Sequence, residues 1–256
     1  MSMPTLEQVI PIIRGAGDAL LERRGADHIK TKAVSDFVTE VDFAVQRAIC
    51  DELARRWPEI QFMGEERDNS DIDFSRPYWV LDPVDGTTNL IHNFHHSVIS
   101  LALVIHHEPQ FGVIFNPYAD EMFTAVKGGG AFCNGKPIHV SAAPSLSEAL
   151  VFVGTAPYRR NEMEENFMRI MRVYRSSHDV RRFGCTALEL CYLACGRADG
   201  YFEYGVKPWD IAAGILILQE AGGEAVTVEG EIPPLDRECA MVATNGNFTE
   251  ELRVIM

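Results

Sequence analysis

The sequence is short of basic residues, and this shortage limits the partners that suit it. Lys and Arg together number 23 against 37 Asp and Glu, which gives a formal net charge of −14 at pH 7. Nucleic acids and anionic membrane surfaces both require a basic footprint, so we expect neither as the main partner. The local basic pairs at 159–160 and 181–182 are interpreted as solvated or pocket-edge charges. An acidic chain with clustered carboxylates either binds cations or repels itself.

Long apolar runs, a secretory leader and paired cysteines are also missing. No apolar run approaches the ~20 residues that span a bilayer, and the N-terminus lacks the basic-then-apolar layout of a signal peptide. The six cysteines include no CxxC pair, and Cys191 and Cys195 are interpreted as buried small residues rather than metal ligands. These absences favour a globular protein of the reducing cytoplasm.

Hydrophobic periodicity predicts helices and strands in both halves of the chain. A capping box at residues 5–8 starts one helix, although Pro11 means that this helix is either kinked or begins later. In the first half we expect, in addition, a helix over 40–56, a strand over 61–63, a polar loop over 67–77, consecutive antiparallel strands over 97–126 and a hairpin turn at 134–135.

The second half alternates strands with helices, which indicates layered α/β packing. The expected elements are strands near 150, 179, 200, 224 and 239, with helices over 163–174, 186–195 and 210–221 and a closing helix. A small polar stretch over 141–148 suggests a boundary. We therefore expect an N-terminal α+β subdomain over 1–143 and a C-terminal α/β subdomain over 144–256, joined in one compact catalytic unit.

The stretch "WVLDPVDGTTN" at 79–89 places two aspartates at the end of a buried strand. Asp82 and Asp85 would repel each other if they converged, and hard divalent cations such as Mg²⁺ relieve such repulsion. Side chains three apart in a strand point to opposite faces unless the chain turns, and Pro83 supports a turn. Haloacid-dehalogenase phosphatases use a shorter Asp-x-Asp-Gly-Thr motif, so we set that class aside.

The residues that follow supply the other half of a phosphate–metal site. Gly86 allows an unusual turn and the close approach of a ligand. Residues 87–89 would open a helix or turn whose free N–H groups suit a phosphate. Further acids stand where strands end or helices begin, and each alone also fits a helix cap or a solvated turn: Asp42, Glu65, Glu66, Glu203 and Asp210, the last as a plausible N-cap.

These motifs resemble the inositol monophosphatase family, within the superfamily of Mg²⁺-dependent, lithium-sensitive phosphatases. The resemblance is closest to the bacterial inositol-1-monophosphatases and covers nearly the whole chain. It implies a layered αβαβα sandwich with two sheets, of the inositol monophosphatase and fructose-1,6-bisphosphatase type, and a homodimer. The motifs occur in family order: "DFVTEVD" (36–42), "GEE" (64–66), "WVLDPVDGTTN" (79–89), "GGGAFCNG" (128–135) and "GYFEYGVKPWDIAAG" (200–214).

The resemblance also implies roles for individual residues. Two to three Mg²⁺ ions would be bound by Glu65, Asp82, the carbonyl of Val84, Asp85 and Asp210. Thr87, supported by Asp42 and Thr39, would orient and activate a metal-bound water, and Glu65 would help to hold a weaker third ion. Lys32 matches a flexible loop lysine only approximately. The substrate-binding set would be Gly86, Thr87, Thr88, Gly184, Cys185, Thr186, Glu203 and Asp210.

The implied reaction is in-line hydrolysis of a myo-inositol monophosphate by a metal-activated water, without a phosphoenzyme. The alternatives are a phosphatase of sugar phosphates, histidinol phosphate or 3′-phosphonucleotides, and a regulatory protein that keeps the fold. The chain departs from the family pattern at Leu90, His95 and Arg67, which puts substrate specificity in question. His92, His95 and His96 suggest zinc, but a solvated loop or a partner-facing surface is the favoured interpretation.

Overall fold

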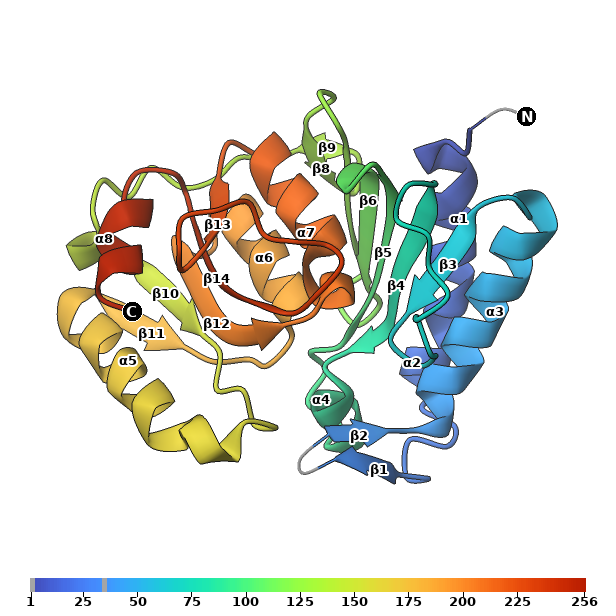
Figure 1. The fold of residues 1–256 in the computed structure, drawn as a ribbon, viewed down its shortest axis with the longest axis horizontal. Helices are drawn as coiled ribbons and strands as arrows, with labels where there is room; N and C mark the ends of the chain where they lie inside the picture. Colours follow the sequence, from blue (N-terminus) through green and yellow to red (C-terminus); the bar gives the residue numbers. More distant parts are fainter. Residues whose placement is uncertain (1–2, 34–35) are drawn as a thin grey trace.

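The computed structural model describes residues 3–33 and 36–256, and these form five stacked layers of helices and sheets (Figure 1). A seven-stranded sheet and a five-stranded sheet enclose a central pair of helices, and further helices cover the outer face of each sheet. This confirms the expected αβαβα sandwich. The outer helices are α1 (Leu6–Ala16) and α3 (Glu40–Arg56) on one side and α5 (Met163–Ser176) and α8 (Thr249–Val254) on the other, with α6 (Thr186–Ala194) and α7 (Pro208–Glu220) between the sheets.

The larger sheet has the strand order β3-β4-β5-β6-β7-β8-β9. Only β3 and β4 run parallel, and every later neighbour is antiparallel, as expected for the consecutive strands over 97–126 and for the hairpin at 134–135. The strands are β3 (Gln61–Gly64), β4 (Tyr78–Asp85), β5 (Val98–Ile105), β6 (Glu108–Asn116), β7 (Glu121–Val126), β8 (Ala131–Cys133) and β9 (Lys136–Pro137).

The end of β4 breaks its register with β5 between Asp82 and Asp85. The turn expected from Pro83 is instead an irregularity within the strand, since β4 continues through Pro83 to Asp85, and both acids line the same cleft. Gly86 then adopts φ +91° and leads into the short helix α4 (Thr87–Ile91). The sheet consequently presents both aspartates and a helix N-terminus at one edge.

The smaller sheet has the order β11-β10-β12-β14-β13. β10 is parallel to β11 and β12, whereas β14 is antiparallel to both of its neighbours. α7 follows β12 after a single residue, which brings the second half's acids toward the first sheet. The strands are β10 (Leu150–Val153), β11 (Asp179–Arg181), β12 (Gly200–Val206), β13 (Glu224–Thr227) and β14 (Cys239–Thr244).

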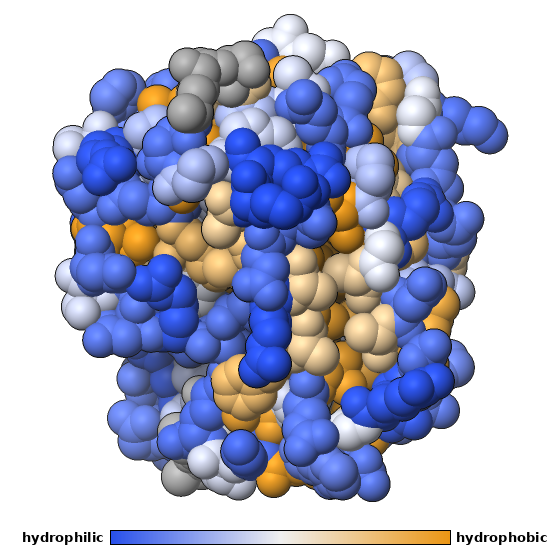
Figure 2. All heavy atoms as spheres, turned by 90° about the vertical axis from the view of Figure 1, so that its right-hand side faces the viewer, coloured by the Kyte–Doolittle hydropathy of each residue, from blue (hydrophilic) through white to orange (hydrophobic). Residues whose placement is uncertain are grey.

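The outer helices bury one face only. α3 places Val41, Val45, Ile49 and Leu53 against the sheet, each at most 1% exposed. Seen from the side of α1 and α3, the surface is largely hydrophilic, with apolar atoms exposed between the polar side chains (Figure 2). α1 begins at Leu6 and continues through Pro11, so the possibility of a later start is wrong.

A few elements lack any strong periodic signal and were not expected. These are α2 (Asp18–Glu22) and a hairpin of β1 (Lys30–Ala33) and β2 (Asp36–Val38) that lies beside α4. Four- and three-residue strands are too short to show a period. The hairpin matters because it carries Lys32 to the edge where β4 ends.

α6 and α7 join the two halves into a single core. They belong to the second half of the chain, yet α7 packs directly on the first sheet, where an added Cβ on Gly112 would lie 2.9 Å from the Cα of Ala213. The boundary at 143/144 falls between the sheets, but each proposed subdomain needs the other to cover its sheet. Among residues 3–33 and 36–256, every helix is too short or too polar to cross a membrane.

Candidate active site

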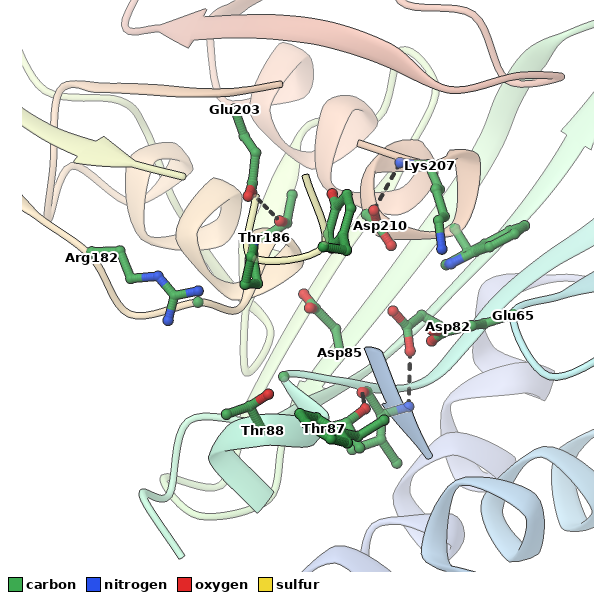
Figure 3. Close-up of a pocket in the computed structure, with 17 residues that line it drawn as sticks. Glu65, Asp82, Asp85, Thr87, Thr88, Arg182, Thr186, Glu203, Lys207 and Asp210 are labelled. Carbon is green, nitrogen blue, oxygen red and sulfur yellow. Dashed lines mark hydrogen bonds between the residues drawn. The ribbon is translucent and has the colours of Figure 1, made fainter. Parts of the chain in front are cut away.

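A cleft between the two halves gathers five carboxylates, two cationic side chains and the start of α4 (Figure 3). Its walls come from segments far apart in the sequence. One wall is formed by Phe37, Glu65, Asp82, Val84, Asp85, Gly86, Thr87 and Thr88, and the other by Pro157, Tyr158, Arg182, Gly184, Thr186, Glu203, Lys207, Trp209 and Asp210.

Asp82 and Asp85 are held by backbone amides at the end of β4. One oxygen of Asp82 accepts a hydrogen bond from the N–H of Val84 at 2.9 Å, and Asp85 Oδ2 accepts one from the N–H of Ala187 at 2.6 Å. Asp82 is 2% exposed and Asp85 is 9% exposed. Because Ala187 lies in the first turn of α6, the carboxylate of Asp85 links the two halves of the molecule.

Burial and mutual repulsion disfavour the charged forms of these acids. Burial, reinforced by the charges of Glu65 and Asp85, raises the pKa of Asp82 well above its usual value. Burial raises the pKa of Asp85 to about 7, and burial together with the charges of Asp85 and Glu65 raises that of Asp210 well above its usual value. Raised carboxyl pKa values of this kind are typical of sites that bind a cation.

Asp210 belongs to the first turn of α7. It is the third residue of that helix rather than its N-cap, so the N-cap assignment is wrong, and its carboxylate accepts a hydrogen bond from the N–H of Lys207 at 2.8 Å. This reach back to the helix start leaves the second carboxylate oxygen available to the cleft. Asp210 faces Asp85 across the cleft in Figure 3.

Thr87, Asp42 and Thr39 form one hydrogen-bonded group. Thr87 Oγ1 lies 3.1 Å from a carboxylate oxygen of Asp42 and 3.1 Å from the carbonyl oxygen of Val84, and its single proton can go to either. The other oxygen of Asp42 accepts from the N–H and hydroxyl of Thr39 at 2.8 and 2.6 Å. Asp42 is therefore both a capping residue of α3 and the support of Thr87. Burial raises its pKa.

Lys32 is the cation nearest to the glutamates that follow β3. Its Nζ lies 3.2 Å from Glu65 and also contacts Glu66. Although burial lowers the pKa of Lys32, the two carboxylates raise it above its usual value overall. Among the described residues, no three acidic, His or Cys side chains already surround one point that could hold a metal ion. The cleft thus collects oxygen donors without closing them on a common centre.

Known proteins with the same fold give this cleft its context. A profile of the Inositol monophosphatase family matches residues 3–254. The Nus factor SuhB of Xylella fastidiosa is 34% identical over 100% of this chain and 95% of its own, and the inositol-1-monophosphatase of Rhizobium meliloti is 36% identical over 89% and 85%. The structure of a Thermotoga maritima IMPase superposes with a TM-score of 0.88 at 32% identity, covering 98% of this chain and 95% of that one.

The chain belongs to the inositol monophosphatase family. Enzymes of this family depend on metal ions, and the oxygen-only donor set of the cleft fits a hard cation. The residues expected from family motifs all lie in or directly behind the cleft. What the motifs do not reveal is which of them face the open space.

Of the residues expected to bind substrate, Cys185 lies farthest from where we expected it. It is 1% exposed and is absent from the cleft wall, and its thiol lies 3.4 Å from Asp85 Oδ2. Burial raises the pKa of this thiol well above its usual value, so the thiol donates to Asp85 rather than carrying charge. Cys185 supports a metal-ligand candidate from behind.

Glu203 is more heavily engaged than expected for a residue that binds substrate. It accepts hydrogen bonds from the N–H of Ala156 at 3.2 Å, the hydroxyl of Thr186 at 3.2 Å and the hydroxyl of Tyr201 at 2.7 Å. These bonds fix its carboxylate at the edge of the cleft and hold the 154–158 loop against β12. A substrate hydroxyl would have to share or replace one of them.

Several wall residues had no role in the sequence interpretation. Lys207 and Trp209 sit inside the "KPWD" stretch, and their closeness to Asp210 was an available signal. Phe37 lies inside the "DFVTEVD" motif, which was a similar signal, whereas Pro157 and Tyr158 gave none. Two of the three histidines of the 92–96 loop stack on different rings: His95 lies on Tyr118 at 4.9 Å and His96 on Phe183 at 5.0 Å.

Proposed function

We propose that the protein is a metal-dependent phosphomonoesterase that hydrolyses myo-inositol monophosphates to inositol and phosphate. The observation that carries this proposal is the meeting of Asp82, Asp85 and Asp210 with the start of α4 in one cleft. Carboxylates beside free amides favour a cation and a phosphate together more strongly than either feature alone. Membership of the inositol monophosphatase family supports the substrate class.

The metal ligands we propose are Glu65, Asp82, the carbonyl of Val84, Asp85 and Asp210, holding two to three Mg²⁺ ions. When bound, such ions supply Lewis acidity and make water a stronger nucleophile at neutral pH. The same ions would supply the positive charge that these buried acids lack. All of the donors are oxygen atoms, which suits Mg²⁺ better than a softer metal.

Thr87 orients the attacking water in this scheme. Its hydroxyl donates to Asp42 or Val84, so its lone pairs remain available to accept a hydrogen bond from water. Thr39 holds Asp42 in place from behind. Gly86, Thr87 and Thr88 hold the phosphate through N–H and hydroxyl groups, and φ +91° at Gly86 lets the chain bring them close to it.

The leaving polyol occupies the opposite wall, beside Gly184, Thr186 and Glu203. Glu203 accepts a hydrogen bond from one polyol hydroxyl, and Cys185 keeps Asp85 oriented from behind. Hydrolysis proceeds without a phosphoenzyme. Further proposals from family resemblance are a cytoplasmic homodimer and a match of Lys32 to a loop lysine near the metal site.

A phosphate-release panel tests the proposal. Purified protein with Mg²⁺ should act on myo-inositol 1-phosphate, lose activity with EDTA and be inhibited by Li⁺. A strong preference for histidinol phosphate or a 3′-phosphonucleotide would replace the inositol assignment. Rapid-quench labelling should trap no phosphoprotein, and a trapped one would exclude direct attack by water.

A regulatory function is the second candidate, because a relative that aligns with the whole chain is named a Nus factor. The cleft retains every proposed ligand, which favours catalysis. Absence of turnover on the entire panel, with normal folding and Mg²⁺ bound, would support the regulatory alternative.

A further inference from the structure

The two walls of the cleft need a fixed separation if one ligand is to touch both. The phosphate-binding groups proposed above stand at the start of α4, and the polyol-binding groups stand at and beside the turn over 183–186. Figure 3 shows Thr87 and Thr88 on one side of the open space and Thr186 and Glu203 on the other. Because these segments are far apart in the sequence, contacts between α4 and the turn decide the separation of the walls.

Asn89 crosses from α4 to this turn. It is 7% exposed and lies behind the cleft wall. Its side-chain amide donates to the carbonyl oxygens of Phe183 at 2.8 Å, Gly184 at 3.2 Å and His96 at 2.7 Å. Two amide hydrogens are therefore shared among three carbonyl oxygens, which belong to two separate segments of the chain.

The same amide also lies next to the phosphate-binding turn. A Cβ added to Gly86 would lie 3.3 Å from Asn89 Nδ2 and 2.7 Å from the carbonyl oxygen of His96. The ring of His96 stacks in turn on that of Phe183, with 5.0 Å between the ring centres. The start of α4, the 92–96 loop and the turn at 183–184 are thus packed as one unit around Asn89.

Glu189 holds the same two turn residues through their N–H groups. It belongs to α6 and is 2% exposed, and one of its oxygens accepts from Phe183 at 2.8 Å and from Gly184 at 3.2 Å. The carbonyl and N–H groups of residues 183 and 184 are therefore all engaged, the carbonyls by α4 and the N–H groups by α6.

Asp85 makes a second crossing between the halves, to the N–H of Ala187. Because Asp85 is also a proposed metal ligand, changing it would disturb metal binding as well as the spacing. Asn89 has no proposed role in binding metal or phosphate, so a change at Asn89 isolates the spacing of the two walls.

We propose that Asn89, with Glu189 behind the turn, is a positioning residue that sets the distance between the phosphate-binding and polyol-binding walls. It thereby determines the preference for leaving alcohols whose hydroxyl groups reach Thr186 and Glu203. This inference rests on the proposed phosphatase function and deepens it. A buried carbonyl oxygen that loses its donor is costly until the backbone moves or water enters. Loss of the Asn89 amide therefore lets the turn shift, which weakens contacts to the polyol.

Selectivity measured in variants tests this role. We would determine kcat and KM for myo-inositol 1-phosphate and for p-nitrophenyl phosphate, whose leaving group carries no further hydroxyl, in wild type and Asn89→Ala. We expect the ratio of kcat/KM for the inositol substrate to that for p-nitrophenyl phosphate to fall at least about tenfold, as for a buried hydrogen-bond partner removed. The Mg²⁺ concentration that gives half-maximal activity should not change, because the proposed metal ligands are kept.

Asn245→Ala is the matched control. Asn245 is 4% exposed, lies outside the cleft wall, and its amide likewise donates to three oxygens, two of Ser141 and the carbonyl oxygen of Ala143. Its loss should lower stability but keep the wild-type selectivity ratio. An unchanged ratio in Asn89→Ala, or equal losses on both substrates, would overturn the inference.

Variants of Glu189 test the other side of the turn. Glu189→Ala should lower the selectivity ratio as Asn89→Ala does, and Glu189→Gln, which keeps the acceptor, should retain the wild-type ratio. Circular dichroism shows whether each variant folds, and the two Glu189 variants decide the outcome if Asn89→Ala does not. Equal ratios in Glu189→Ala and the wild type would contradict the role of the turn.

A binding measurement separates this inference from the proposed function. Calorimetric titration with myo-inositol 1-phosphate and with inorganic phosphate, in Ca²⁺ in place of Mg²⁺, needs no turnover. Binding of inositol 1-phosphate that weakens about tenfold or more in Asn89→Ala, with phosphate binding unchanged, supports the role of Asn89 even if no substrate is hydrolysed. Equal weakening of both ligands, or a wild type that does not bind inositol 1-phosphate, contradicts it.

Discussion

Asp82 and its neighbouring acids are costly for the protein in the absence of cations. A buried carboxylate without a compensating charge destabilises the folded state and takes up a proton instead. The raised pKa values of Asp82, Asp85 and Asp210 express that cost. Amide donors reduce the cost without cancelling it. Residues in such a position are explained by what they bind rather than by what they stabilise.

We predict that Asp82→Asn lowers kcat/KM by about a thousandfold or more, because the amide keeps the shape but loses the charge that holds a cation. The variant should also lose the stabilisation that Mg²⁺ gives the wild type, about 2.7 kcal/mol at a hundred times Kd. Thermal unfolding with and without Mg²⁺ measures this. Asp120→Asn, at an exposed surface acid, is the control and should behave as wild type.

The buried carboxyl group of Glu189 should make the free energy of unfolding depend on pH. Burial raises its pKa to about 8 from 4.5, and one of its oxygens accepts from the N–H groups of Phe183 and Gly184. A raised folded-state pKa gives stability that is complete below the unfolded pKa and is lost as pH rises through the folded pKa. The stability that Glu189 contributes is therefore lost between pH 4.5 and pH 8.

Glu189→Gln keeps the acceptor and removes the titration. We expect urea unfolding to show a smaller loss of stability between pH 5 and pH 8.5 in the variant, by as much as about 4 kcal/mol. Parallel curves for the variant and the wild type would mean that Glu189 does not titrate in this range.

At the scale of elements, close approach between α7 and β6 positions Asp210. Gly112 on β6 faces the backbone of Ala213, and on the other side Gly214 faces Leu190 of α6. Small residues let α7 lie between two neighbours at short range. The helix start, and with it Asp210, is set by this packing as much as by its own sequence.

Two glycine substitutions should act in opposite directions. Gly112→Val introduces carbon against backbone atoms that cannot give way, with Cβ 2.9 Å from Ala213, so we expect a loss of about 1–3 kcal/mol and reduced activity. Gly15→Ala in α1 meets no atom within 4 Å and should add about 0.5–1 kcal/mol without affecting activity. Urea unfolding measures both, and equal effects would refute the packing argument.

For the whole molecule, the cleft couples the two halves of the chain. The carboxylate of Asp85 in β4 accepts a hydrogen bond from the N–H of Ala187 in α6, 102 residues away in the sequence. The proposed metal ligands likewise come from both halves of the chain. A cation bound to these ligands would hold the halves together. When the cation is removed, repulsion between the same acids would push the two halves apart.

We therefore predict that Mg²⁺ raises the unfolding temperature as one cooperative transition and that EDTA lowers it, with activity lost in parallel. Calorimetry and phosphate release, recorded on the same samples, measure the two effects. Separate transitions for residues 1–143 and 144–256 under EDTA would show that the halves fold independently. Na⁺ at matched ionic strength is the control.

The sequence by itself determined the layered architecture, the long helices and strands, and the acids and glycines of the cleft. These depend on local periodicity and on motifs such as 79–89, which are complete within a few residues. Only the tertiary structure decided that Cys185 lies behind Asp85, that Glu203 is already engaged by Tyr201, and that Arg182 rather than Arg181 faces the cleft. The physical reason is that side-chain direction at a turn or strand end is set by packing against other elements, as far as 100 residues away for Cys185 and Asp85, and no local pattern records such a contact.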